Sequence, residues 1–241
     1  MYECPRFVYL DPEKTGSSFV IELLKDFALD PPIRNEHHVP MDADCDRSKS
    51  YFISVRDPLD AYISLYSFGC MQQGKLYVRL ARRGLDHHYD GTTKGFNRWL
   101  RFALKKENAT IFDGVSAEDK QVCNLLGPQS YRYFRLAVPD ARKQLASCAT
   151  RKDILALYDK QKLPRYFIRH ETFVQDICAI LRGPLRDHVG DVDAAVRHTR
   201  TARPRNASER IDKGNKDFAV DPALRDRLRE REWFLHRVFG Y

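Results

Sequence analysis

One short segment combines a cation with three hydroxyl groups at a place where an anion can bind. Lys14, Thr15, Gly16, Ser17 and Ser18 follow one another directly. The apolar run before them favours a strand, and the apolar spacing after them favours a helix. Between a strand and a helix, backbone N–H groups and the positive end of the helix dipole attract an anion. This loop is therefore the first candidate site, for a phosphate or sulfate group.

The loop differs from the P-loop of nucleotide kinases. That motif reads G-x-x-x-x-G-K-[ST], and with Lys14 as its lysine, Val8 and Glu13 stand at the two glycine positions. The next apolar run ends in Arg56 instead of an acidic residue that would hold Mg²⁺. A metal-dependent phosphoryl transferase is thus the weaker alternative, and the pattern favours chemistry without a metal.

A second anion-binding cluster follows the next predicted strand, residues 51–55. Arg56 stands at the end of that strand, and Ser64 lies on the helix that begins at Pro58, with Asp57 as its cap. Ligands of open α/β folds bind at the carboxyl ends of the strands. Two such clusters on neighbouring strand–helix units suit a ligand with two separated anionic groups.

These two segments, EKTGSSF and YFISVRDPLDAYISLY, together resemble the paired signature of a known enzyme family. The family is that of sulfotransferases that use 3′-phosphoadenosine 5′-phosphosulfate (PAPS), and the Golgi carbohydrate type is more similar than the cytosolic aryl type. The resemblance implies that residues 14–18 bind the 5′-phosphosulfate. It also implies that Arg56 and Ser64 bind the 3′-phosphate, and that Lys14 stabilises the leaving phosphate.

The resemblance continues along the chain. NEHHVP is similar to a segment of the uronyl 2-O-sulfotransferases whose histidine before the valine is the general base, which implies this role for His38. His37 and Glu36 are close competitors. RPRNASER resembles a cofactor loop, which implies that Ser208 contacts PAPS. The family implies a P-loop-like sulfotransferase fold, a single domain over residues 1–241, and in-line transfer to a hydroxyl without a metal.

The elements that position these residues alternate along the chain. Strands are expected over residues 6–10, 51–55 and 166–169, and helices over 19–27, with Ser17 or Ser18 as cap, over 58–66 and over 173–181. Alternating strands and helices indicate an α/β fold, in which helices flank a central, mostly parallel sheet. Further helices are expected over residues 96–104, 121–126, 141–148 and 222–238.

Positive charge is concentrated in two blocks. The chain of 241 residues has 41 Lys and Arg against 33 Asp and Glu, a net charge of +8. Residues 71–106 carry +7 and residues 197–216 carry +5, so the remainder is acidic at −4. One block adjoins the expected PAPS site, and the other indicates an anionic acceptor, with Arg79, Arg82, Arg83, His87, His88 and Trp99 as candidate contacts.

Several classes of acceptor and function stay open. The expected acceptor is a hydroxyl of a carbohydrate or glycan, and a small-molecule metabolite or a peptide is the alternative. A non-catalytic polyanion-binding protein is the alternative of another class, although the sequence contains no motif for DNA or RNA binding.

Composition also bears on the compartment. The chain contains no run of 18 apolar residues, and its six cysteines show no metal-ligand spacing. A cytoplasmic protein with free thiols is expected, and a lumenal catalytic domain excised from a secretory precursor is the alternative.

Overall fold

The central strands of the sheet run parallel to one another. The computed structural model describes residues 1–113, 124–202 and 218–241. Strand β4 (Ser50–Val55) pairs in parallel with β2 (Phe7–Leu10) on one side and with β5 (Tyr166–Arg169) on the other. Every residue of β2 is buried, and so is every residue of β4 after Ser50. These strands are mostly apolar, with the buried Ser54 as an exception in β4, because both faces of the sheet are covered.

Two short strands extend this sheet in the opposite sense. β1 (Tyr2–Glu3) pairs antiparallel with β2 and with β3 (Arg34–Asn35), giving the order β3-β1-β2-β4-β5. The prediction of an α/β fold with helices flanking a sheet is confirmed. The sheet is mixed, however, and not mostly parallel, because two of its four strand pairings are antiparallel.

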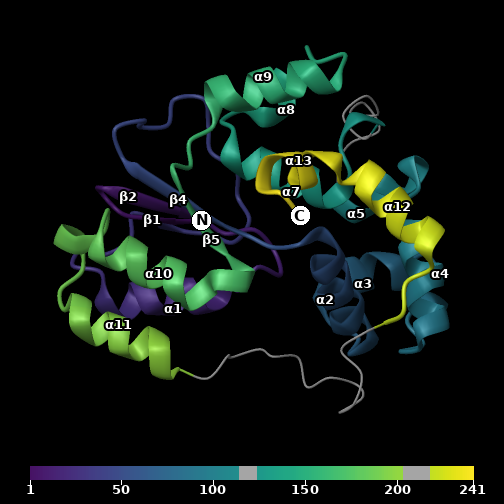
Figure 1. The fold of residues 1–241 in the computed structure, drawn as a ribbon, viewed down its shortest axis with the longest axis horizontal. Coiled ribbons are helices and arrows are strands. Elements are labelled where there is room, and N and C mark those ends of the chain that lie inside the picture. Colours follow the sequence, from purple (N-terminus) through teal and green to yellow (C-terminus); the bar gives the residue numbers. More distant parts are fainter. Residues whose placement is uncertain (114–123, 203–217) are drawn as a thin grey trace. The chain divides into compact units, whose positions relative to one another are not determined.

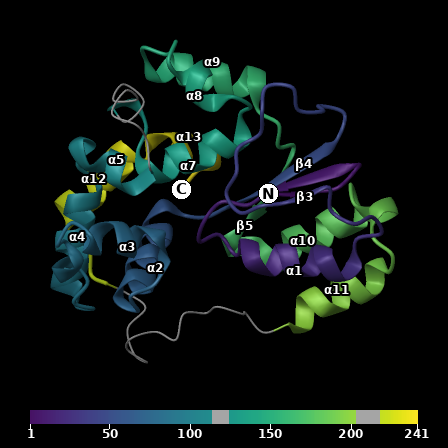
Figure 2. The same ribbon diagram turned by 180° about the vertical axis from the view of Figure 1, so that it is seen from behind.

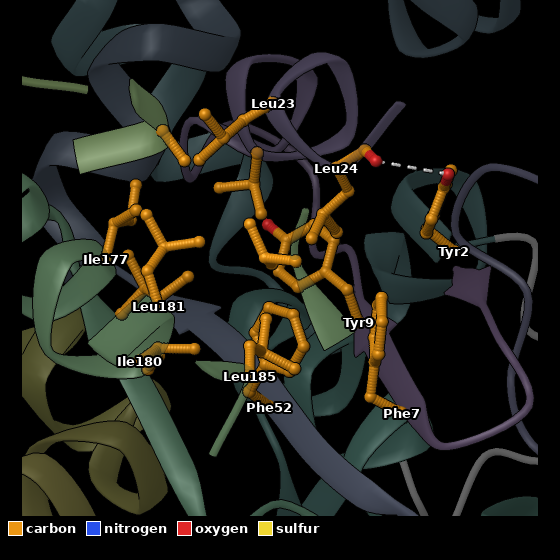
Figure 3. Close-up of a cluster of buried hydrophobic side chains, with 14 of the residues drawn as sticks. Tyr2, Phe7, Tyr9, Leu23, Leu24, Phe52, Ile177, Ile180, Leu181 and Leu185 are labelled. Carbon is orange, nitrogen blue, oxygen red and sulfur yellow. Dashed lines mark hydrogen bonds between the residues drawn. The ribbon is translucent and has the colours of Figure 1, made fainter. Parts of the chain in front are cut away.

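Three helices cover one face of the sheet. They are α1 (Ser17–Phe27), α10 (Phe173–Arg182) and α11 (Val192–Thr201) (Figure 1). In both views α8 (Ala141–Leu145) and α9 (Arg151–Gln161) lie on the opposite side of the sheet (Figure 2). Figure 3 shows how Tyr9 and Phe52 of the strands gather with Leu24 and Leu185, and how the Tyr2 hydroxyl donates to the Leu24 carbonyl at 3.4 Å. This apolar core holds the strand ends in place.

The chain divides into two compact units. The first comprises Met1–Arg56, Tyr133–Ser147 and the stretch from Lys152 through α11. The second comprises Asp57–Arg132, Cys148–Arg151 and the C-terminal end. The expectation of a single domain over residues 1–241 stays a prediction.

The second unit is helical, and its core is aromatic. Trp99, Tyr66, Phe96 and Phe112 are all at most 1% exposed and pack on one another. The helices that lie in this unit, α7 only in part, are α2 (Pro58–Cys70), α3 (Gly74–Ala81), α4 (Thr93–Ala103), α5 (Ala109–Asp113), α7 (Pro128–Ala137), α12 (Pro222–Arg231) and α13 (Trp233–Phe239). Short 3₁₀ turns of the described chain are Asp86–His88, Lys106–Asn108, His170–Thr172 and Arg186–His188.

The predicted C-terminal helix over residues 222–238 is two helices with Glu232 between them. The Glu232 side chain is fully buried, and its carboxylate accepts hydrogen bonds from the Tyr62 hydroxyl at 2.6 Å and from the Gln129 amide at 3.1 Å. It also accepts from the amide and the hydroxyl of Ser130, each at 2.8 Å. The break therefore places a carboxylate at the N-terminal end of α7, where the helix dipole favours a negative charge.

The other helix predictions hold to within a few residues. Those over 19–27, 58–66, 96–104 and 173–181 correspond to α1, α2, α4 and α10. The helix over 141–148 is shorter than predicted, because α8 ends at Leu145. The helix expected over 121–126 lies partly outside the described residues. Within the described ranges, each helix is too short or too polar to cross a membrane.

Candidate functional site

The loop between β2 and α1 has an unusual backbone. Lys14 and Gly16 adopt left-handed conformations, with φ of 66° and 86°. Thr15 is buried, and its hydroxyl donates to the Pro12 carbonyl at 2.8 Å. The N-cap of α1 is Gly16, and no side chain of the described residues caps it, so the prediction that Ser17 or Ser18 is the cap was wrong. Both serines lie inside the first helical turn, and the Phe19 amide that follows them donates to the Gly16 carbonyl at 3.1 Å. The N-terminal end of a helix of this length favours an anion.

Arg56 joins this loop from the neighbouring strand. It directly follows β4, and its Nη1 donates to the main-chain carbonyl of Lys14 at 3.1 Å. β2 and β4 are adjacent and parallel, so their carboxyl ends lie at one edge of the sheet. The structure thus brings together the loop and the arginine that the sequence predicted as two clusters.

The electrostatics of the loop favour a bound anion. Burial lowers the pKa of the Lys14 ammonium; Glu13 opposes this shift, and the positive charge of Arg56 adds to it. Two cations held close together are costly without a negative charge between them. An anion bound at this loop would relieve the repulsion and raise the pKa of Lys14 again.

Gly16 is required for two reasons, and its replacement tests the loop. A Cβ atom at this position would lie 2.7 Å from the ring of Phe173, and φ of 86° disfavours every L side chain. Gly16→Ala should lower the free energy of unfolding by about 2–5 kcal/mol in a denaturation experiment, because the backbone cost and the steric cost add. Gly84→Ala is the control, since φ there is 67° and nothing lies within 4 Å, so only the backbone cost of about 1 kcal/mol is expected. Equal losses for both variants would mean that the contact with Phe173 is unimportant.

Two histidines lie beside the same strand end, and both contact Asp11. Asp11 directly follows β2 and is fully buried. Its Oδ2 lies 2.9 Å from Nδ1 of His37, and its Oδ1 accepts the His38 main-chain N–H at 2.9 Å. The main-chain carbonyl of Asp11 lies 2.6 Å from Nδ1 of His38. One residue at the strand end therefore holds both candidate bases.

These contacts define the hydrogen positions on the His38 ring. A carbonyl oxygen only accepts hydrogen bonds, so Nδ1 of His38 carries the hydrogen in its contact with Asp11. In the neutral ring the lone pair is then on Nε2. The side chain is 31% exposed, so this nitrogen belongs to a group that a substrate can approach. His38 has the features required of a general base.

The two competitors for this role differ from His38. The Glu36 carboxylate is exposed and pairs with Nε of Arg34 at 2.6 Å. The His37 side chain is 60% exposed, and its Nδ1 contacts the Asp11 carboxylate. Asp11, His37 and His38 also bring three groups of metal-ligating types within 4.8 Å of one another. Their hydrogen bonds to one another already use Nδ1 of both rings and the carboxylate, an arrangement that suits proton transfer better than metal binding.

His38 shares its unusual backbone conformation with Lys14. Its φ is 60°, and in the described chain positive φ occurs at four residues that are not glycine: Lys14, His38, Gln72 and Asp140. Arg135 supports this conformation, because its Nη2 donates to the His38 carbonyl at 3.1 Å. Left-handed backbone at non-glycine residues tends to cluster at functional sites.

The remaining predicted site residues lie elsewhere or outside the described residues. Ser64 is half-buried on α2 and belongs to the second unit. Ser208 lies outside the described residues. The structure therefore brings together residues 14–18 and Arg56, and it places His37 and His38 on Asp11 at the end of the same strand.

Asp11 and Arg135 also belong to this site, although neither was predicted from the sequence. Asp11 carried a signal, because a charged residue that directly follows a buried strand needs a partner. Arg135 carried none, since it lies 97 residues from His38 along the chain.

The basic block over residues 71–106 is partly neutralised and partly structural. A hollow of about 590 Å³ is lined by Lys94, Asn97, Arg98, Arg101, Ala219, Val220 and Asp221. Arg98 pairs with Asp90 at 3.0 Å, and Arg101 lies 3.7 Å from Asp221. Trp99 is fully buried in the aromatic core, so the prediction that it contacts the acceptor was wrong. Arg79 donates to two main-chain carbonyls, a structural role.

Comparisons with known proteins leave the family undetermined. No protein-family model, curated protein or solved structure matches the chain. The arguments for function therefore rest on the loop, on Arg56 and on the two histidines.

Proposed function

We propose that this protein is a PAPS-dependent O-sulfotransferase with a P-loop-like sulfotransferase fold. The observation that carries the proposal is the contact between Arg56 and the left-handed loop at Lys14, which unites two cations from neighbouring strand ends. PAPS has two separated anionic groups, and the two cations Lys14 and Arg56 can each bind one of them. In this proposal residues 14–18 bind the 5′-phosphosulfate, and Arg56 binds the 3′-phosphate.

The chemistry requires a base and a charge-stabilising group, and the site offers both. The acceptor hydroxyl oxygen attacks sulfur and forms an S–O bond, while the bond from sulfur to the phosphate oxygen breaks in line with it. The hydroxyl proton passes to Nε2 of His38. The leaving group, 3′-phosphoadenosine 5′-phosphate (PAP), keeps the electron pair of the broken S–O bond. Lys14 stabilises the negative charge that develops on the leaving phosphate. The transfer is balanced without a metal.

The proposed acceptor is a hydroxyl of a carbohydrate or glycan. A negatively charged glycan agrees with the net charge of +7 over residues 71–106. A metabolite or a peptide is the alternative acceptor. A transfer assay with labelled PAPS against a panel of glycans, phenols and peptides would show which class of acceptor is sulfated.

Binding of PAP tests the proposal directly. Lys14→Asn removes the charge and keeps a residue type that tolerates the left-handed backbone, and Arg56→Gln removes the second cation. Each should weaken PAP binding about 10- to 100-fold in isothermal titration calorimetry, because each removes a charge-assisted contact. Lys25→Ala is the control, since Lys25 is exposed on the last turn of α1.

Other outcomes would refute the proposal. If the wild type does not bind PAP, or if both variants bind it as tightly as the wild type does, the loop is not a PAPS site. Mg²⁺-dependent ATP turnover would favour a phosphoryl transferase instead. Salt-sensitive binding of heparin without saturable PAP binding would favour a non-catalytic polyanion-binding protein.

A further inference from the structure

We propose that Asp11 is a positioning residue that fixes the hydrogen-bonding pattern of His37 and His38, so that His38 presents an unprotonated Nε2 to the acceptor. The inference rests on the proposed function for its catalytic consequence, but its structural part stands on the contacts of Asp11 alone. Asp11 lies outside the two anion-binding motifs, EKTGSSF and YFISVRDPLDAYISLY.

The Asp11 carboxylate is surrounded by donors. Oδ1 lies 2.5 Å from the main-chain nitrogen of Met1 and accepts the His38 main-chain N–H at 2.9 Å. Oδ2 accepts from Nδ1 of His37 at 2.9 Å and lies 3.6 Å from Nδ1 of His38. The carboxylate is fully buried, so these contacts replace the water it has lost. A buried carboxylate with this many donors holds its neighbours in one arrangement.

The main chain of Asp11 also accepts a hydrogen bond from His38. Its carbonyl accepts the Nδ1–H of His38 at 2.6 Å, while its carboxylate accepts the main-chain N–H of the same residue. Asp11 thus binds both the ring and the main chain of His38, whose backbone is left-handed with φ of 60°. Rotation of the ring would break the contact of Nδ1, so the ring stays oriented.

The charged groups around this pair are of both signs. When Nε2 takes the acceptor proton, the His38 ring becomes positive, and the Asp11 carboxylate, with Oδ2 at 3.6 Å from Nδ1, is a negative charge beside it. The Met1 ammonium pairs with Oδ1 of the same carboxylate at 2.5 Å. The Arg135 guanidinium, at the His38 carbonyl, and the His37 ring lie close by and do not supply a negative charge. Burial and the Asp11 charge both raise the pKa of the Tyr9 hydroxyl, which forms a hydrogen bond with the Ser54 hydroxyl at 2.6 Å. Asp11 is therefore the group that balances the charge formed on His38.

The hydrogen positions themselves test the structural part in the wild-type protein. Long-range ¹H–¹⁵N NMR spectra of protein labelled on its histidine rings distinguish the two neutral tautomers, and His38→Asn identifies the His38 signals. We expect neutral His38 and His37 both to carry their hydrogen on Nδ1. A neutral His38 with its hydrogen on Nε2 would overturn the inference, whatever the activity.

Asp11→Asn tests the catalytic part. The amide oxygen can still accept the His38 main-chain N–H, whereas its NH₂ group then faces Nδ1 of His37, which must become an acceptor. We expect His37 to switch its hydrogen to Nε2, and kcat to fall at least about tenfold with PAP affinity unchanged. Asp11→Ala keeps the main-chain carbonyl at Nδ1 of His38 but offers neither carboxylate oxygen, and it should lower kcat further.

The failures of the two proposals are distinguishable. If the wild type neither binds PAP nor transfers sulfate, the proposed function fails, and the tautomers can still be measured. If the wild type transfers sulfate and Asp11→Asn is folded and equally active, Asp11 does not position the base. Should Asp11→Asn not fold, the wild-type tautomers alone decide the inference.

Discussion

His38→Asn is expected to lower turnover about 10²- to 10⁴-fold, the usual contribution of a general base. Asparagine is chosen because it tolerates the left-handed backbone at this position, where φ is 60°, and therefore removes the ring without adding strain. PAP affinity should be unchanged, because the role proposed for His38 is toward the acceptor and not toward the anionic groups of PAPS. Steady-state kinetics together with PAP titration measure both quantities.

Two further histidine variants make this experiment specific. His198→Asn is the control, since His198 is exposed on α11, packs on Phe19 and has no role in the proposed site. His37→Asn should lower turnover less than His38→Asn, because His37 contacts the Asp11 carboxylate without being the base. A larger loss for His37→Asn would identify His37 as the base and contradict the assignment.

Glu232→Ala is expected to destabilise the second unit by about 3 kcal/mol or more. The variant removes an acceptor of four hydrogen bonds and leaves the Tyr62 hydroxyl, the Ser130 hydroxyl and two helix amides without it in a buried place. Glu232→Gln should lose less, because its amide oxygen still accepts. Chemical denaturation followed by circular dichroism provides the measurement.

The neighbouring glutamate provides a matched control for this variant. Glu230 lies two residues earlier on α12 and is exposed, so Glu230→Ala should change the free energy of unfolding by less than about 0.5 kcal/mol. If Glu232→Ala is no less stable than Glu230→Ala, the buried carboxylate does not stabilise the junction of α12, α13 and α7.

The sequence was sufficient for the parts of the fold that rest on local patterns. Strands β2, β4 and β5 are short segments rich in apolar and aromatic residues, and α1, α2, α4 and α10 have clear helical spacing, so each was predicted within a few residues. β1 and β3 were missed because two-residue strands have no visible alternation and exist only through pairing with each other and with β2. The break at Glu232 was missed for a similar reason, since its four donors come from distant parts of the chain.

In the candidate site, too, the features set by local sequence were predictable and those set by contacts between distant residues were not. The meeting of Arg56 with the loop at Lys14 was predictable, because the carboxyl ends of parallel strands lie at one edge. The cap of α1 was mispredicted because serine is the statistical choice, whereas the left-handed turn requires Gly16. The role of Asp11 depends on His37 folding back over 26 residues of sequence, which no local pattern encodes.

The left-handed backbone at Lys14 and His38 has a consequence for protein engineering. Each non-glycine residue in this conformation costs about 1–2 kcal/mol that glycine would not. A library selected only for thermal stability should therefore enrich glycine at Lys14 and His38, as at Gln72 and Asp140, and the variants with glycine at the first two positions should be inactive. Stability and activity would be traded against each other at these two sites, so any attempt to make this protein more robust should hold both residues fixed.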